Sequence, residues 1–467
     1  MHFSNWTRLA RPGGALMRGA PRRTDVTCAH RCLTAAAARH SEKPHDLTPN
    51  RRSVRLEDDR LRRGRGTPAI QLHHPAGGAA SGVEMLVTRE KIEAHEDAAL
   101  SPVAIRSRDS RGRAFPEDEP TYRTAFQRDR DRILHTTAFR RLEYKTQVFV
   151  NYEGDYYRTR LTHTLEVAQI GRTIARALGA NEDLVEAICL AHDLGHPPFG
   201  HAGEATLSRL MTGRGGFDHN KQSLRIVTIL EHRYPGFVGL NLTWEVREGI
   251  VKHETEYDIA DAQEFEPEKR GHLEAQIANV ADELAYTAHD LDDGLRAGLI
   301  SPAGLGGVGL WEKVRESIGW RDQPFDETVR HRLIRRLIGI EVTDLLLATQ
   351  KRLEEGQVET VAGLQLLSHN VVGFSDSLAQ LNRELKGFLF KNMYQHYRVI
   401  RMQVKAERFL EDLFEAYTRN PETLPDEIQD RARETDVYRT VCDYIAGMTD
   451  RFALEERDKL FDPHKRP

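Results

Sequence analysis

The stretch from His192 to His201 holds more groups able to do chemistry than any other part of the chain. His192 and Asp193 are adjacent, so an imidazole and a carboxylate can bind one divalent cation. Gly195 and the two prolines after His196 end a helix and turn the chain, which leaves further imidazoles on the turn. A metal-binding pair followed by spare imidazoles predicts a hydrolytic centre.

Two residues elsewhere in the chain extend this pair to a four-ligand site. His163 precedes the pair and Asp282 follows it, each within a helical pattern. Two imidazoles and two carboxylates can hold a divalent metal and leave positions open for water or a phosphate oxygen, and this mixed set favours Mn, Fe, Co or Mg over a closed zinc site. Each residue alone has an ordinary interpretation as a core or surface side chain, but all four in this order are not expected by chance.

Three predicted helices must position these ligands. Apolar residues at helical spacing predict one helix from Arg158 to Leu178, which contains His163 and ends at Gly179. Residues 182–194 predict a second helix that ends at the His–Asp pair. The third predicted helix has two different sides. Its buried apolar stripe is formed by Leu273, Ile277, Val280, Leu284 and Leu291. Its polar side is formed by Asn279, Asp282, Tyr286, His289 and Asp290.

Helical patterns dominate the rest of the chain from about Tyr122 onward. Long ones recur at 330–355 and 378–418. Neither a βαβ alternation nor a glycine-rich phosphate loop occurs, which argues against a Rossmann or P-loop enzyme. The predicted fold class is all-α.

Composition excludes several other classes of protein. The 467 residues are 39% hydrophobic and 30% charged, and no run of about 18 apolar residues occurs, so we expect no membrane association. Four cysteines are too few for a disulfide scaffold, which favours a cytoplasmic protein. Residues 85–467 carry 52 Lys and Arg against 64 Asp and Glu. This acidic balance argues against a broad DNA-binding surface, though not against a local basic pocket.

Residues 1–84 differ in character from the remainder. They carry 15 Lys and Arg against 7 Asp and Glu and show no apolar periodicity, which predicts a disordered basic extension. The segment resembles a transit peptide, or else it precedes a true start at Met85. Cys28, His30 and Cys32 would supply half of a zinc site, but no second ligand pair follows nearby, so we expect no structural zinc.

Longer phrases resemble a known family. The order H…HD…D resembles the HD-domain metal-dependent phosphohydrolases, and the phrases resemble bacterial deoxyguanosine triphosphate triphosphohydrolases, in particular their triphosphohydrolase-like branch. The resemblance runs from about residue 100 to about residue 415. The phrases that carry it are FQRDRDRILH at 126–135, AFRRLEYKTQVF at 138–149, RTRLTH at 158–163, AHDLGHPPFGHAGE at 191–204, GFDHN at 216–220, GLNLT at 239–243 and LEAQ at 273–276.

This resemblance implies a domain organisation. The HD phosphohydrolase core is expected at 158–295, after an N-terminal lead-in segment at 85–157. A helical C-terminal region at 296–467 is expected to complete the pocket and to make oligomer contacts. Relatives form homo-oligomers, some with activating nucleotides between subunits, so a homo-oligomer is expected and an allosteric dNTP is left open.

The implied reaction is cleavage of a deoxynucleoside triphosphate, nominally dGTP, to the deoxynucleoside and inorganic triphosphate. The metal would polarise an α-phosphoryl oxygen and lower the pKa of bound water. His201 and Glu204, one helical turn apart, match the family's catalytic pair. His201 would transfer a proton to the leaving 5′-oxygen or act directly at phosphorus, and the sequence leaves both open. The ordinary alternative is that His201 caps a helix and Glu204 is solvated.

The resemblance also implies contacts to the substrate. Phosphate contacts are expected from Arg160, His196 and His219, and sugar contacts from Tyr286, Asp290 and Tyr394. Lys221 stands where relatives more often have a small residue.

Two rival functions remain open. One is an HD phosphohydrolase that acts on nucleoside monophosphates or alarmones. The other is a catalytically silent nucleotide sensor or single-stranded nucleic acid binder, against which the intact His201 and Glu204 argue. The sequence does not rank the four bases or identify the metal.

Overall fold

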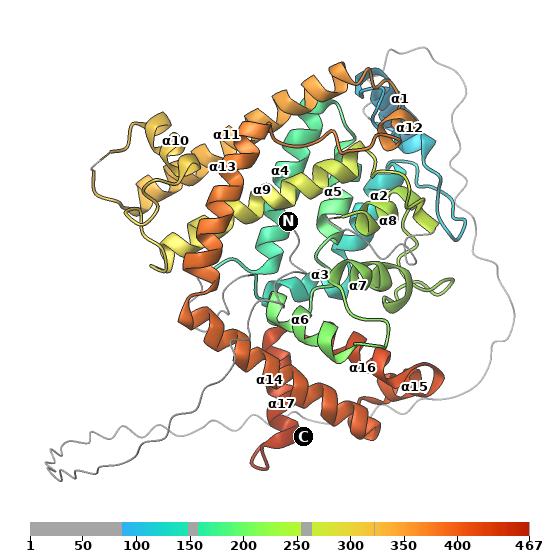
Figure 1. Ribbon diagram of the computed structural model, residues 1–467. Helices are drawn as coiled ribbons and strands as arrows, with labels where there is room; N and C mark the ends of the chain where they lie inside the picture. The colour runs from blue at the N-terminus through green and yellow to red at the C-terminus, as the bar shows by residue number, and fades with distance from the viewer. Residues whose placement is uncertain (1–85, 148–156, 254–263, 322, 467) are drawn as a thin grey trace, which may run out of the picture. The chain divides into compact units, whose positions relative to one another are not determined.

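The described residues fold mainly into helices, which confirms the predicted all-α fold class. The computed structural model describes residues 86–147, 157–253, 264–321 and 323–466, and within these ranges extended pairing is limited to isolated bridges (Figure 1). None of the helices in these ranges has the length and hydropathy needed to cross a membrane. The predictions of a disordered extension, of a transit peptide and of no structural zinc concern residues 1–84, which lie outside the described residues.

Three mutually packed helices form the centre of the core. They are α4 (Arg160–Leu178), α5 (Glu182–Ala191) and α9 (Leu273–Arg296). The side chain of Thr159 caps the start of α4, and Gly179 ends it in the left-handed conformation with φ of 66°. The predicted limits of α4 are therefore confirmed to within two residues. α5 ends earlier than predicted, with His192 as its C-cap.

Helix α9 is more completely buried than its sequence pattern suggests. Its apolar stripe is confirmed apart from the partly exposed Val280, but His289 and Asp290, expected on a polar side, are also buried. The reason is that α9 packs against α4, α5, α8, α11 and α13 and has little surface left for solvent. Conversely, Leu165 has an apolar side chain but lies on the outer side of α4 and is 47% exposed.

The remaining helices pack around this centre or, in the case of α14 to α17, form a second group with α6. In chain order they are α1 (Arg89–Ala99), α2 (Ala125–Leu134), α3 (Thr137–Arg141), α6 (Gly200–Leu210), α7 (His219–Arg225), α8 (Trp244–Val251), α10 (Gly309–Ile318), α11 (Glu327–Glu355), α12 (Val361–Gln365), α13 (Asp376–Leu389), α14 (Tyr397–Arg419), α15 (Asp426–Glu434), α16 (Val437–Ala446) and α17 (Asp450–Phe461).

The pattern predicted at 378–418 forms two helices rather than one. Helix α13 continues into a short π-helical turn at Phe390–Tyr394, and α14 then starts afresh at Tyr397. His396 adopts an extended backbone conformation and its side chain accepts a hydrogen bond from the Arg398 N–H. His396 therefore acts as an N-cap, which interrupts the helix although its neighbours favour one.

Two apolar clusters stabilise the described part of the chain. The larger one surrounds α4, α5 and α9 and extends to α10, α11 and α13. The smaller one joins α6 to α14, α16 and α17. The turn after His192 leads from the first cluster into the second, so both cores hold the turn in place.

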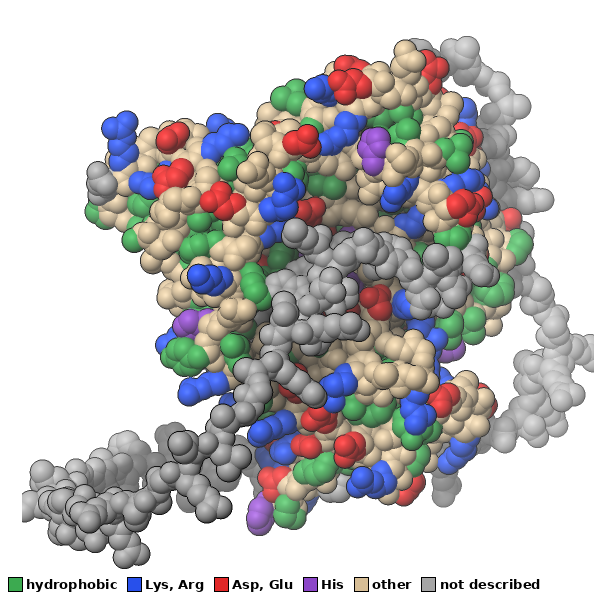
Figure 2. All heavy atoms as spheres, in the orientation of Figure 1, with side chains coloured by type: hydrophobic (Ala, Val, Ile, Leu, Met, Phe, Trp, Pro, Cys, Tyr) green, Lys and Arg blue, Asp and Glu red, His purple; other side chains and the backbone are tan. Residues whose placement is uncertain are grey.

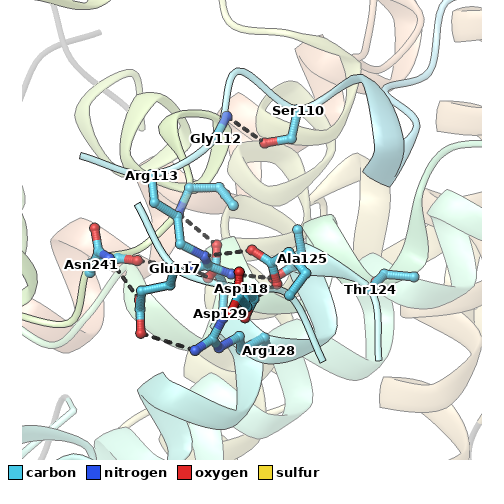
Figure 3. Close-up of polar contacts among 12 residues, drawn as sticks. Ser110, Gly112, Arg113, Glu117, Asp118, Thr124, Ala125, Arg128, Asp129 and Asn241 are labelled. Atoms are coloured by element: carbon cyan, nitrogen blue, oxygen red, sulfur yellow. Dashed lines mark hydrogen bonds and ion pairs between the residues drawn. The ribbon is translucent and has the colours of Figure 1, made fainter. Parts of the chain in front are cut away.

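A buried ion-pair network anchors the segment before α2. The Arg113 guanidinium, 3% exposed, pairs with the fully buried Asp129 and also donates to the Asn241 carbonyl oxygen at 2.7 Å. The Asn241 amide in turn donates to Glu117 at 2.7 Å. Figure 3 shows these side chains converging from α2, from the segment before it and from the loop at 239–243. The network fixes the loop that leads into α8.

Acidic and basic side chains are mixed on the visible surface. On the face shown in Figure 2, Lys and Arg of the described residues alternate with Asp and Glu and form no single broad basic area. This agrees with the acidic balance of residues 85–467.

Candidate active site

The four predicted metal ligands meet in one buried cluster. His163 lies in the first turns of α4, His192 and Asp193 at the end of α5, and Asp282 in the middle of α9. His163 Nε2 lies 2.8 Å from Asp282 Oδ1. His192 Nε2 lies 3.4 Å from Asp193 Oδ1 and 3.5 Å from Asp282 Oδ1. The helices therefore bring together groups that are far apart in sequence.

The donor atoms of this cluster fit a divalent metal. His192 Nδ1 lies 2.6 Å from the Cys189 carbonyl oxygen, to which it donates its proton, so Nε2 is left as an acceptor. Nε2 is buried without a hydrogen-bond partner, which is costly unless a cation binds there. His163, His192 and Asp193 offer ligand atoms that lie within 4.8 Å of one another.

Electrostatics in the cluster favour positive charge. Burial acts to lower the pKa of His192, but the charges of Asp193 and Asp282 outweigh it and raise that pKa to about 9. Burial acts to raise the pKa of Asp193, but His192 and Arg160 hold it below its usual value. A cation that binds here replaces a proton that the carboxylates already attract.

Arg160 extends the cluster toward a second group of side chains. Its side chain is 2% exposed, and Nη1 donates to Asp193 Oδ2 at 2.8 Å. Its Nε and Nη2 are buried and have no hydrogen-bond partner. The guanidinium is therefore fixed by one carboxylate and keeps two donors for a further anion.

The second group contains the predicted catalytic pair. His201 and Glu204 share one face of α6, with Nδ1 and Oε2 3.5 Å apart. The shorter contact of Glu204 is to His219, whose Nδ1 lies 2.6 Å from Oε1. His196 stacks on His219 with ring centroids 4.0 Å apart. His219 was predicted only as a phosphate contact. In the structure it makes a closer contact with Glu204 than His201 does.

The two stacked histidines of this group have pKa values that are shifted in opposite directions. Burial acts to lower the pKa of His219, but Glu204 outweighs it and raises that pKa to about 10. His196, buried beside Arg160 and other histidines, has a pKa well below its usual value. His219 therefore carries positive charge at neutral pH, and His196 is neutral.

A close helix approach sets the distance between the two groups. A Cβ at Gly195 would overlap the His219 carbonyl oxygen and the Ser223 amide nitrogen. The Gly195 N–H donates to the Ser223 hydroxyl at 2.8 Å, which joins the turn to α7. The Phe199 N–H donates to Asp450 at 2.8 Å and ties the same turn to α17.

The predicted sugar contacts lie together at α9 and the π-helical turn. The hydroxyl of Tyr394 donates to that of Tyr286, and the two rings are parallel, with centroids 6.4 Å apart. Asp290 is buried and its Oδ2 has no partner. Burial and the nearby Asp293 raise the pKa of Asp290, so its carboxyl group is favoured in the neutral form.

Two histidines of the site were missed in the sequence. His289 Nδ1 lies 3.2 Å from His163 Nδ1, and its Nε2 lies 2.9 Å from Glu166 Oε2. His253, just after α8, lies with Nε2 3.6 Å from Asp282 Oδ2. The helical position of His289, seven residues after Asp282, could have indicated it. No spacing in the sequence connects His253 to the four predicted ligands.

Comparisons with known proteins agree with this geometry. A family model described as "HD domain" matches residues 160–287, which include all four predicted ligands. A model described as "Phosphohydrolase-associated domain" matches residues 372–459.

Curated relatives match most of the chain. It is 55% identical over 375 residues to the "Deoxyguanosinetriphosphate triphosphohydrolase-like protein" of Geobacter metallireducens, covering 79% of this chain and 97% of the relative. The protein of the same name from Geobacter sulfurreducens is 53% identical over 384 residues, which is 82% of this chain and 100% of the relative. That of Parvibaculum lavamentivorans is 50% identical over 387 residues.

Proposed function

We propose that this chain, a phosphohydrolase of the family of deoxyguanosinetriphosphate triphosphohydrolase-like proteins, acts on deoxynucleoside triphosphates. In this proposal the nominal substrate is dGTP, and cleavage occurs at the α-phosphorus. The products are the deoxynucleoside and inorganic triphosphate. The observation that carries this proposal is the buried Arg160, which keeps two donor nitrogens free of protein partners between the metal-ligand cluster and the Glu204–His219 pair. A polyphosphate needs such fixed cationic donors.

We assign a divalent metal to His163, His192, Asp193 and Asp282. When bound, it supplies Lewis-acid polarisation of a phosphoryl oxygen and a bound water of lowered pKa. The chain itself orients the ligands. His163 Nδ1 donates to His289, and His289 donates to Glu166, so His163 Nε2 faces Asp282.

His201 acts on the leaving group in this proposal. Water attacks the α-phosphorus and loses a proton to solvent, the bond from phosphorus to the 5′-oxygen breaks, and His201 gives its proton to that oxygen and regains one from solvent. Glu204 accepts from His201 and is itself held by His219, which keeps the imidazole of His201 oriented. Direct attack of His201 at phosphorus would instead leave a phosphorylated histidine, which acid-quenched mass spectrometry distinguishes from proton transfer.

The sugar binds at α9 in the same proposal. The Oδ2 atom of Asp290, which has no hydrogen-bond partner, would bond the 3′-hydroxyl, and the Tyr286–Tyr394 pair would pack beside the sugar. In this position the Tyr394 ring would lie close to C2′ and would exclude ribonucleotides by steric clash with the 2′-hydroxyl. Tyr394→Ala is therefore expected to reduce discrimination between dGTP and GTP.

Product analysis tests the reaction. The metal-stripped full-length chain is reloaded with Mg²⁺ or Mn²⁺ and given each dNTP and NTP, alone and in pairs, and the phosphate products are separated by ion-exchange chromatography. Inorganic triphosphate with a free deoxynucleoside supports the proposal. Orthophosphate or pyrophosphate would refute it, and activity on monophosphates or alarmones would favour the rival phosphohydrolase.

Two variants separate turnover from binding. His201→Ala is expected to abolish hydrolysis while dGTP binding, measured by calorimetry, is retained. His369→Ala, an exposed histidine remote from these residues in the chain, is the matched control. If neither the native chain nor the control hydrolyses any nucleotide but both bind dGTP, the chain is a sensor rather than an enzyme.

The resemblance to this family also suggests how the chain assembles and how its activity is regulated. We propose a homo-oligomer, which light scattering at several concentrations tests. Activation by a second dNTP would appear as faster triphosphate release from nucleotide pairs than from either nucleotide alone.

A further inference from the structure

His253 occupies a fixed position beside the metal-ligand cluster. Its side chain is 1% exposed, and its ring centroid lies 5.1 Å from that of His192. The backbone is held on both sides, because Asn220 donates to the His253 carbonyl oxygen at 2.9 Å and Asn279 donates to the Lys252 carbonyl oxygen at 3.1 Å. The imidazole is therefore held at the cluster by α7 and α9.

Both ring nitrogens of His253 are buried without a hydrogen-bond partner. The nearest acidic atom, Asp282 Oδ2, lies 3.6 Å from Nε2, which is too long for a hydrogen bond. A buried imidazole with two unpaired nitrogens is unfavourable unless a ligand is present. This arrangement is not explained by the four-ligand site alone.

The distances from His253 to His192 and Asp282 match those between ligands of one ion. His192, His253 and Asp282 each offer an atom within 4.8 Å of the others. With metal–ligand bonds of about 2.0–2.2 Å, neighbouring ligand atoms lie about 3–4 Å apart. The 3.6 Å between His253 Nε2 and Asp282 Oδ2 falls in that range.

We propose that His253 is a fifth protein ligand of the metal centre and adds a third imidazole to those of His163 and His192. Three nitrogens with two carboxylates favour a divalent transition ion such as Mn²⁺, Fe²⁺ or Co²⁺ over Mg²⁺, which prefers oxygen. In a six-coordinate ion, one position remains for water or a phosphate oxygen. The inference deepens the proposed function because it concerns the same centre, but its test needs no nucleotide.

The experiment counts the nitrogens bound to the ion. Full-length native chain, His253→Ala and the exposed-histidine control His369→Ala are stripped of metal and reloaded with Mn²⁺. Pulsed EPR then reports the number of coordinated imidazole nitrogens, and calorimetry gives the affinities for Mn²⁺ and Mg²⁺. We expect three nitrogens in the native chain and the control and two in His253→Ala. Mn²⁺ affinity should fall at least about tenfold in that variant and Mg²⁺ affinity much less.

Several outcomes would overturn the inference. Two nitrogens in the native chain, or an unchanged count in His253→Ala, would exclude direct ligation. A weaker affinity with an unchanged count would mean that His253 only positions Asp282. If His253→Ala fails to fold without metal by circular dichroism, His253→Gln, which keeps the side-chain size, is measured in its place with the same expected loss of one nitrogen. Failure of nucleotide hydrolysis would leave these readouts unaffected.

Discussion

Replacing Arg160 should reduce activity through the loss of two phosphate contacts. The side chain is buried, one of its nitrogens pairs with Asp193 at 2.8 Å, and Nε and Nη2 are left without protein partners. A hydrogen bond to a charged group contributes about 1.5–3 kcal/mol, so two to the substrate contribute about 3–6 kcal/mol. For Arg160→Ala this is a loss of about 10²–10⁴ in kcat/KM for dGTP.

The lysine variant refines this prediction. Arg160→Lys keeps the charge but has one nitrogen, which cannot serve Asp193 and two phosphate oxygens in the same planar arrangement. We therefore expect Arg160→Lys to lower kcat/KM for dGTP, but by less than Arg160→Ala does. Arg172→Ala, on the same helix and paired with Glu186, is the control and should stay near the native value.

The assay must separate phosphate contacts from metal binding, because Arg160 also pairs with Asp193. Steady-state kinetics with dGTP are measured at saturating Mn²⁺, and Mn²⁺ affinity is measured separately by calorimetry. The reasoning is refuted if folded, metal-saturated Arg160→Ala keeps kcat/KM within about fivefold of the native chain, since the two buried donors would then contribute less than about 1 kcal/mol.

Three further predictions concern stability and the site. Burial raises the pKa of Glu341 to about 8, above its usual value of 4.5, so the folded state binds a proton more tightly than the unfolded one and stability falls as pH rises from about 4.5 to about 8. Glu341→Gln should remove this dependence, a change on the order of 5 kcal/mol across that range. Equal slopes of urea midpoint against pH in both proteins would contradict it. Arg113→Ala should lower the free energy of unfolding by about 3–5 kcal/mol, because it leaves the buried Asp129 unpaired. The double variant Arg113→Ala with Asp129→Ala should regain part of that loss, and equal midpoints for the single and double variants would count against the pairing. Gly195→Ala should push α7 away from the turn and abolish activity. Native hydrolysis and melting temperature in that variant would show that the close approach is unnecessary.

Local sequence was sufficient for the helices that carry the ligands. Apolar spacing and Gly179 predict the limits of α4, because periodicity and capping act over a few residues. His163, His192, Asp193 and Asp282 were found by residue type and order, and they lie in one cluster. The all-α fold class was confirmed for the same reason.

Predictions failed where a distant part of the chain decided the outcome. His289 and Asp290 were placed on a polar side because their residue types are polar, but other helices cover that side of α9. The pattern at 378–418 gave no sign of the break at His396, since capping depends on the backbone conformation of one residue. The domain boundaries and the roles of the individual site residues stay predictions.

Residue type and neighbours within a few turns were enough to predict candidate metal ligands and the helices that carry them, because helix formation and ligand chemistry are local properties. Only the tertiary structure decided which side chains pair. Glu204 makes its short contact with His219 from another helix, and His253 reaches the cluster from beyond α8. Such contacts depend on the packing of helices far apart in the chain, which no local pattern records.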